Sequence, residues 1–326
     1  MRIPYTEGKK VLFITTKQLD YIRSSQEITL LRESAESVTV IGSNHKKYLF
    51  RLVKVFSSLL TCHMRKYDTV FIGFAPQLVL PFFCWKMKQQ HIVIDFFISL
   101  YDTMVMDRKR FKPGSIFARI LHYFDRITIA HADEIIADTQ AHSSYFIHEF
   151  NADQEKIHVL YLKADQKIYY PRVMEKPQHL KNKYVVLYFG SILPLQGVDT
   201  IIEAIDLCRS ESDIHFIVIG PIPEQNRKNM ENTEYIDFLP QPHLAEEIAK
   251  ADLCLAGHFN ASIEKASRTI PGKAYIYEAM NKEMILGENP ANHELFTEDS
   301  KHHFIPMGNP KALADKIKSL YFLRTR

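Results

Sequence analysis

Three cations stand close together in the second half of this chain, and their spacing favours the binding of an anion. Lys265, Arg268 and Lys273 lie within nine residues, and Pro271 and Gly272 interrupt the chain just before a helix expected to begin near Lys273. Arginine can contact two phosphate oxygens at once, and lysine provides a compact positive charge. Both stabilise the negative charge that builds on a departing diphosphate. The cluster therefore predicts a phosphate site, with a solvated basic loop as the alternative.

A strand that ends in glycine precedes this cluster. Residues 184–189 (YVVLYF) are β-branched, aromatic and apolar, which is typical of a buried parallel strand. Gly190 and Ser191 end it, Gly197 follows a proline-containing turn, and residues 199–207 have helical periodicity. Backbone N–H groups at such a loop and helix start favour phosphate. Any parallel α/β protein needs turns of this kind, so a purely structural role is the alternative.

Together these segments resemble the donor-binding half of a GT-B glycosyltransferase of the family-4 retaining type (bacterial glycosyltransferase group 1). KASRTIPGKAY (265–275) resembles KAQRVIPNKVY of a bacterial subgroup, with all three cations matched. FGSILPLQGVDTI (189–201) resembles YGTFIPLQGVEYI of the same subgroup, and GENPANHELF (287–296) resembles GDSPAARELF. The resemblance covers nearly the whole C-terminal half of the chain. It implies that this half binds a nucleotide sugar.

The resemblance implies a set of donor contacts. Gln196 stands where the wider family often has a phosphate-binding lysine, and the nucleobase is expected near the strand ends at Gly220 and Phe238. The full set of expected donor-binding residues is Gly190, Ser191, Gln196, Gly220, Phe238, Lys265, Arg268, Lys273 and Glu278.

One position departs from the family pattern. The family holds the donor ribose with a glutamate, and the resemblance puts Ile276 in that place. Glu278 is the nearest carboxylate, two residues on and about 200° around a helix. Either the helix start is shifted so that Glu278 reaches the ribose, or the ribose is held differently, or donor binding is weak.

Strands alternate with helices in both halves of the chain, which predicts an α/β fold with a doubly wound parallel sheet in each half. Ligands of such sheets bind at the carboxyl ends of the strands. We expect two Rossmann-like domains, an acceptor-side domain at 1–170 and a nucleotide-sugar donor domain at 171–326. The resemblance implies that they face a cleft, as in the GT-B architecture. The expected strands are 11–15, 38–42, 69–74, 92–96 and 134–138, then 184–189, 214–220, 234–238, 252–256, 283–287 and 302–306.

Asp95 is the candidate catalytic residue of the N-terminal half. It lies at the end of the expected strand 92–96, where the resemblance places the cleft, and a turn or helix-capping role is the alternative. The glycine pair that many family members carry after the first strand is absent, since TTKQLDYIRSS stands at 15–25. Phosphate binding by that loop is therefore not expected.

Composition indicates a protein of two domains without a cofactor or metal. A chain of 326 residues can bury two cores. The four cysteines are far apart, and neither they nor the histidines have the spacing of a metal site, which agrees with the metal independence that the resemblance implies. No signal peptide or apolar run of membrane-spanning length is present, so we expect a cytoplasmic protein. A nucleic-acid partner is not expected.

A basic amphipathic segment, 45–66, suggests an anionic membrane surface as a further partner. Seven apolar residues form one helical stripe, and three cations lie off it; a second basic cluster occupies 108–119. Such a helix can lie on an anionic membrane, and a helix that packs its stripe into the core is the alternative. The stripe is Tyr48, Leu49, Leu52, Val53, Phe56, Leu59 and Leu60, and the cations are Lys47, Arg51 and Lys54.

The function expected from these observations is a retaining, metal-independent glycosyltransferase. It would move a sugar from a nucleotide-sugar donor to a carbohydrate or lipid-linked acceptor in bacterial surface polysaccharide or glycoconjugate assembly. It would act in the cytoplasm or on the inner face of the cell membrane. A catalytically inactive GT-B partner or activator of another transferase is the first alternative, motivated by Ile276 and the missing glycine pair. A nucleotide-sugar epimerase on the same fold is the second.

Overall fold

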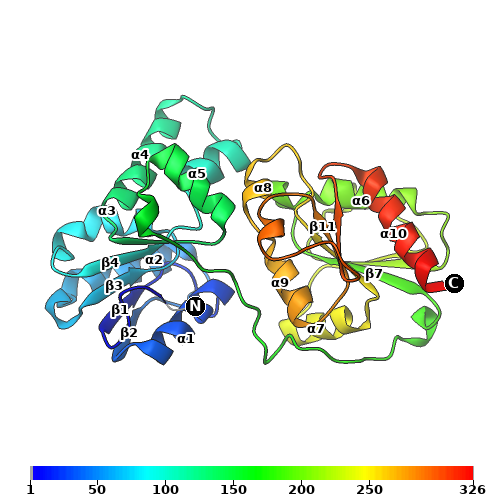
Figure 1. Ribbon diagram of the computed structural model, residues 1–326, viewed down its shortest axis with the longest axis horizontal. Helices are drawn as coiled ribbons and strands as arrows, with labels where there is room; N and C mark the ends of the chain where they lie inside the picture. The colour runs from blue at the N-terminus through cyan, green and yellow to red at the C-terminus, as the bar shows by residue number, and fades with distance from the viewer. Residues whose placement is uncertain (1–2, 326) are drawn as a thin grey trace. The chain divides into compact units, whose positions relative to one another are not determined.

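A computed structural model describes residues 3–325 and divides the chain into two compact units, Met1–Lys163 and Ala164–Arg326. Each unit is a parallel β-sheet with helices packed on it (Figure 1). The α/β class and the doubly wound sheets expected from the alternating pattern are confirmed. The boundary between the units falls at 163/164, a few residues before the expected position at 170/171.

The N-terminal unit has six parallel strands in the order β2-β1-β3-β4-β5-β6. Five of them lie where the apolar runs predict them. The sixth, β6, is only three residues long, which leaves too short a pattern to identify in the sequence. The strands are β1 (Lys10–Ile14), β2 (Ser37–Ile41), β3 (Thr69–Ile72), β4 (His91–Asp95), β5 (Glu134–Ala137) and β6 (Ile157–Val159). The helices are α1 (Ile22–Ser34), α2 (Tyr48–Thr61), α3 (Leu80–Phe83), α4 (Ile116–Ala130) and α5 (Gln140–Phe150).

The C-terminal unit has six parallel strands in the order β12-β11-β10-β7-β8-β9. All six lie at the expected positions. The first strand, β7, is central, so the chain winds outward in both directions from it, and the carboxyl end of β7 is the point at which such sheets bind ligands. The strands are β7 (Tyr184–Phe189), β8 (Ile214–Ile219), β9 (Thr233–Ile236), β10 (Leu253–Gly257), β11 (Met284–Gly287) and β12 (His302–Ile305). The helices are α6 (Val198–Leu207), α7 (Gln241–Lys250), α8 (Lys265–Arg268), α9 (Gly272–Ala279) and α10 (Pro310–Thr325).

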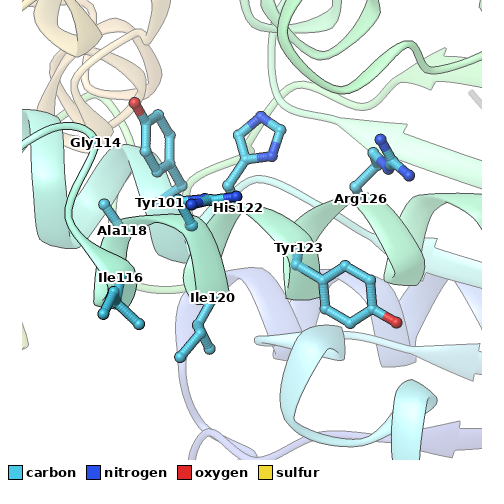
Figure 2. A pocket seen from close by; sticks show the side chains of 9 residues that line it. Tyr101, Gly114, Ile116, Ala118, Ile120, His122, Tyr123 and Arg126 are labelled. Carbon is cyan, nitrogen blue, oxygen red and sulfur yellow. The ribbon is translucent and has the colours of Figure 1, made fainter.

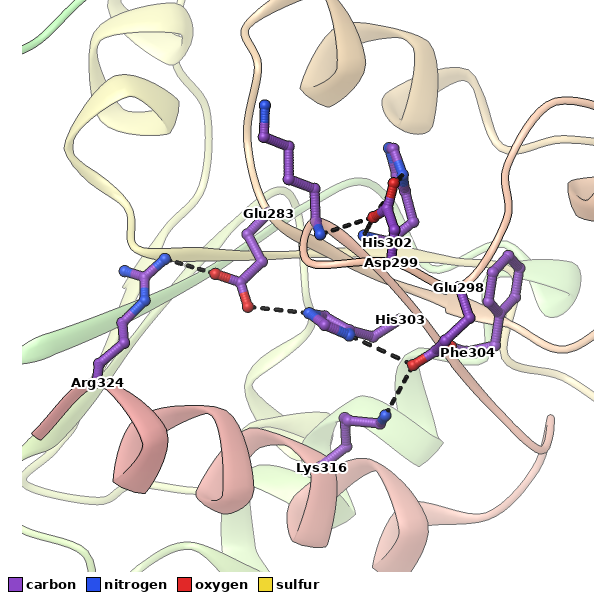
Figure 3. A network of polar contacts seen from close by, with 9 residues as sticks. Glu283, Glu298, Asp299, His302, His303, Phe304, Lys316 and Arg324 are labelled. Carbon is purple, nitrogen blue, oxygen red and sulfur yellow. Dashed lines mark hydrogen bonds and ion pairs between the residues drawn. The ribbon is translucent and has the colours of Figure 1, made fainter. Parts of the chain in front are cut away.

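A polar network fastens α10 to the outer strands of this sheet (Figure 3). His303 Nε2 lies 3.0 Å from Glu283 Oε1, and Lys316 Nζ lies 3.1 Å from Glu298 Oε1. Arg324 also pairs with Glu283. Burial by itself would raise the pKa of Glu283, but the hydrogen bond from His303 and the charge of Arg324 hold that pKa below its ordinary value. The network is structural, because it joins β11, β12 and α10 to one another.

The helix α2 differs from its sequence-based description. Leu59 is buried, but Leu49, Val53 and Leu60 of the predicted stripe are exposed, so the alternative in which the stripe packs into the core is wrong for these three. Arg51 is buried instead, because its guanidinium donates to the carbonyl of Thr16 (3.1 Å) and to carbonyls of the segment that leads into α2. The chain thus uses Arg51 to anchor the helix start, and it is not a surface cation.

Candidate functional site

Lys273 is the centre of the candidate site. It is the second residue of α9, and its side chain is only 6% exposed. The Nζ atom donates a hydrogen bond to Gln196 Oε1 and lies 4.8 Å from the centre of the Tyr188 ring. A Cβ atom built on Gly190 would lie 3.4 Å from the same nitrogen, and one built on Gly257 would lie 3.9 Å from it. The ammonium group is therefore enclosed by the end of β10 and by the end of β7 with the segment that follows it.

The surroundings of Lys273 disfavour its positive charge. Burial lowers the pKa of Lys273 to about 7. A bound anion would reverse this effect, because a neighbouring negative charge stabilises the ammonium form. The Tyr188 hydroxyl is also buried, and it has no hydrogen-bond partner among the residues that the structure describes. It lies 2.9 Å from the position of a Gly190 Cβ, so a second donor is available beside the lysine.

Two glycines bring the ends of β7 and β8 into backbone contact. Gly190 has φ +152° and Gly220 has φ +143°, values that favour glycine. A Cβ on Gly220 would stand 1.9 Å from the carbonyl oxygen of Gly190, which no side chain could tolerate. Gly190 N donates to Ile219 O at 2.8 Å, which fixes the turn to the neighbouring strand. The expected residues Gly190 and Gly220 thus lie side by side at the carboxyl edge of the sheet.

The loop that carries Gln196 is held against the segment after β10. Gly197, with φ +66°, precedes α6, and a Cβ there would lie 2.6 Å from the carbonyl carbon of Phe259. Phe259 N donates to Gln196 O at 3.2 Å, and Asn260 Nδ2 donates to Pro194 O at 2.7 Å. These contacts fix Gln196 and the N-terminus of α6 next to Lys273.

His258 is a further buried residue near the site that the sequence did not reveal. Burial and then the charge of Lys273 lower the pKa of His258 to about 3, so its imidazole is neutral at ordinary pH. Its carbonyl packs against Gly287, where a Cβ would lie only 2.1 Å away. The available signal was Gly257, a glycine directly after the expected strand 252–256.

The other expected cations lie in α8, one short helix before Lys273. The Arg268 side chain is mostly buried, with Nη1 3.3 Å from Glu264 Oε2, and Lys265 is partly buried. The helix α8 packs against the turn 194–196 that carries Gln196. Arg268 and Lys265 therefore belong to the same side of the unit as Lys273. Ser191, directly after Gly190, is exposed.

Two expected donor residues have other surroundings. Phe238 is 77% exposed just after β9, at the carboxyl edge of the sheet but at its outer strand. Glu278 does not join Lys273: its carboxylate lies 2.8 Å from His302 Nε2, at the start of β12. The reason is that α9 runs back from the carboxyl edge to the amino edge of a parallel sheet, which carries Glu278 to the opposite end. Ile276, the residue at the family's glutamate position, is buried.

Asp95 ends β4 in the N-terminal unit and is completely buried. Both of its carboxylate oxygens accept hydrogen bonds from the Arg23 guanidinium at 2.9 Å. Glu27 lies beside them, and burial together with the charge of Asp95 raises the pKa of Glu27 well above its ordinary value. The structure thus gives Asp95 an internal partner, and a catalytic role for it remains a prediction.

A pocket of about 670 Å³ lies on the N-terminal unit. It is lined by residues along α4 together with Tyr101 and Gly114 (Figure 2). Within residues 3–325, no three histidine, cysteine or acidic side chains gather as metal ligands. Among the helices of the same residues, none combines the length and apolar character needed to span a membrane.

Comparison with known proteins identifies a family match within the C-terminal unit and solved structures that share the fold of the chain. Residues 183–322 match the family described as glycosyl transferases group 1. No curated protein matches the sequence significantly.

Solved structures resemble the whole chain. HepE of Anabaena, in complex with UDP-glucose, has a TM-score of 0.64 at 16% identity, covering 97% of this chain and 91% of that one. Sucrose-phosphate synthase of Thermosynechococcus elongatus has a TM-score of 0.67 at 11% identity, with 96% and 90% covered. A glycosyltransferase of Rickettsia africae has a TM-score of 0.59 at 13% identity, with 98% and 89% covered. At these identities the likeness establishes the fold. The resemblance read from the sequence is confirmed: residues 183–322 match the model of the group 1 glycosyl transferases, and the chain has the GT-B fold of two Rossmann-like domains.

Proposed function

We propose that this protein transfers a sugar from a nucleotide-sugar donor and that its C-terminal unit holds the donor diphosphate. The observation that carries the proposal is the buried Lys273 ammonium, enclosed by glycine turns at the carboxyl edge of the sheet. A diphosphate would place a negatively charged partner beside this ammonium and so stabilise its charged form. The crystal structures of Anabaena HepE with UDP-glucose and with UDP support a nucleotide-sugar donor by analogy of fold.

The chemistry proposed for the site is stabilisation of the leaving group. Protonated Lys273 and the N–H groups at the start of α6 oppose the negative charge that develops on the diphosphate as the glycosidic bond breaks. Arg268 adds a two-point contact. We propose retention of the anomeric configuration, through departure on the same face assisted by the donor phosphate, without a metal ion or cofactor. The acceptor is proposed to be a carbohydrate or a lipid-linked glycan of bacterial surface polysaccharide or glycoconjugate assembly, reached from the cytoplasm.

Nucleoside diphosphates provide the direct test. Thermal unfolding and calorimetric titration of the full chain with UDP, GDP, ADP and CDP, each in the presence of EDTA, should show tight binding of one of them. When the protein is incubated with nucleotide sugars that carry the same nucleotide, it should produce that diphosphate by hydrolysis or transfer of the sugar. If none of the four stabilises the protein, the donor site assigned to Lys273 is wrong.

An inactive GT-B partner protein is the second candidate function. It is favoured by two observations: Ile276 occupies the place of the ribose-binding glutamate and is buried, and Glu278 lies at the opposite end of α9. Binding of a nucleoside diphosphate without release of any from nucleotide sugars, alone or with glycan acceptors, would favour this candidate. Measurable hydrolysis or transfer would remove it.

A further inference from the structure

The N-terminal unit carries a strongly basic stretch between residues 37 and 132. Fourteen lysines and arginines stand there against five aspartates and no glutamate, a net charge of +9 in a chain whose total is +3. Four of the five aspartates are buried, and within this fully described stretch Asp68 is the one exposed carboxylate. The exposed cations include Lys46, Lys47 and Lys54 around α2 and Arg119 on α4. The solvent-facing surface of this stretch is therefore positive.

Large apolar side chains of α2 are exposed on the same surface. Leu49 is 68% exposed, Val53 59% and Leu60 64%. They are spaced at i, i+4 and i+11, so they share one face of the helix. Phe56 lies at i+7 on that face and contacts Phe82 of α3, with ring centres 5.9 Å apart. The exposed row of α2 thus leads directly to α3.

The helix α4 continues this surface. Phe82 is half exposed and stacks on Phe124 of α4, with ring centres 6.0 Å apart. Ile116 and Ile120 are exposed, and Figure 2 shows them projecting from one side of α4 together with Tyr123. The α2–α4 face, defined by Leu49, Val53, Leu60, Phe82, Ile116 and Ile120, is therefore continuous. Exposed apolar residues that form a contiguous patch are unusual on a monomer and mark an interaction site.

We propose that the α2–α4 face docks on a membrane surface that contains anionic phospholipids. Its apolar side chains would enter the boundary between head groups and acyl chains, and its lysines and arginines would contact the head-group phosphates. A second copy of the chain is a poorer partner, because two faces of the same positive charge repel each other. The proposal is independent of the donor site, which lies in the other unit.

Vesicle binding of the full-length protein tests the proposal. The protein should sediment with phosphatidylglycerol vesicles and far less with phosphatidylcholine vesicles. Binding should fall as salt rises, because the screening length drops from about 10 Å at 0.1 M to about 3 Å at 1 M. Lys46→Glu, Lys47→Glu and Lys54→Glu together should lower binding about 100-fold or more, since each lysine near an anionic surface is worth about fivefold. Arg51 is left unchanged, because it is buried and anchors α2.

Matched variants distinguish the effect of the α2–α4 face on vesicle binding from the effects of the protein's total charge and hydrophobicity. Lys167→Glu, Lys181→Glu and Lys311→Glu change the net charge equally on exposed positions of the C-terminal unit and should leave vesicle binding intact. Leu49→Ser with Val53→Ser should lower binding more than tenfold, whereas Val173→Ser with Leu323→Ser should not. Equal losses in the two charge variants would overturn the proposal. So would a wild-type protein that ignores phosphatidylglycerol at low salt, or one whose α2–α4 face instead forms a dimer that Leu49→Ser dissociates.

Discussion

At Lys273, burial acts against the charge that the side chain would carry in water. The site gives the ammonium a neutral amide oxygen from Gln196 and the face of an aromatic ring from Tyr188. These groups orient the nitrogen but do not replace the lost hydration. Because burial lowers the pKa to about 7, a small change in the surroundings decides whether Lys273 is charged. A bound diphosphate would be such a change.

Replacing Lys273 by methionine should separate stability from binding. Since the pKa of Lys273 is about 7 in the folded protein and about 10.5 when exposed, the unfolded chain binds this proton more tightly. The lysine thus destabilises the ligand-free protein most below pH 7, and the penalty is relieved as pH rises toward 10.5. Lys273→Met should raise the unfolding temperature at pH 6. It should also weaken nucleoside diphosphate binding by about 1.5–3 kcal/mol. A variant with lower stability and unchanged affinity would mean that Lys273 is structural.

The titration of Lys273 also predicts how binding depends on pH. Above pH 7 the free lysine is neutral, so a diphosphate must bind together with a proton, and affinity should fall by up to about tenfold per pH unit. Lys273→Arg keeps its charge throughout this range. Calorimetric titration of both proteins at pH 6 through 9 should therefore show a growing disadvantage of the wild type relative to Lys273→Arg. Parallel pH profiles would contradict the assignment.

At the scale of elements, the site depends on turns that admit no Cβ. The ends of β7, β8 and β10 approach one another so closely that Gly190, Gly197 and Gly220 are fixed by contact as well as by backbone conformation. The helix α6 begins directly after Gly197, and α9 begins at Gly272, one residue before Lys273. The site is thus assembled by the order of parallel strands, and not by a local motif.

Two glycine substitutions should differ in how much they lower the free energy of unfolding, because only one of the two glycines is in close contact with another segment. Gly220→Ala places a Cβ 1.9 Å from the Gly190 carbonyl oxygen, so the turn must move. Gly114→Ala is the matched control, since Gly114 also has positive φ (+79°) but nothing lies within 4 Å. Gly114→Ala should lower the free energy of unfolding by about 1–2 kcal/mol, which is the cost of a left-handed backbone conformation for a residue with a Cβ. Urea unfolding should show a clearly larger loss for Gly220→Ala, with weakened diphosphate binding. Equal losses would show that the Gly190–Gly220 contact is not tight.

At the scale of the whole molecule, each unit has its own sheet and its own buried core. The expected donor residues fall within residues 164–326, while Asp95 and the α2–α4 face lie in the other unit. Units with separate cores can fold as separate domains. Donor binding and membrane docking are therefore expected to be properties of different units.

The isolated segment 164–326 should fold and bind the same nucleoside diphosphate as the full chain. Every contact described around Lys273 comes from this segment. Ligand at about 100 times its dissociation constant should stabilise the segment by about 2.7 kcal/mol. Circular dichroism during heating, with and without ligand, measures this. If the segment folds and does not bind, the N-terminal unit must supply essential donor contacts.

The sequence by itself determined eleven of the twelve strands, the two-unit organisation and the cation cluster of Lys265, Arg268 and Lys273, because apolar runs and charge clusters are local properties. It could not show that Glu278 lies at the far end of α9, since that depends on the direction in which the helix crosses the sheet. Nor could it show that Arg51 is buried while Leu49 and Val53 are exposed. A helical stripe indicates which residues share a face, but only the packing of neighbouring elements decides which face is covered. Tertiary structure also decided the environment of Lys273, whose lowered pKa comes from groups distant in the chain.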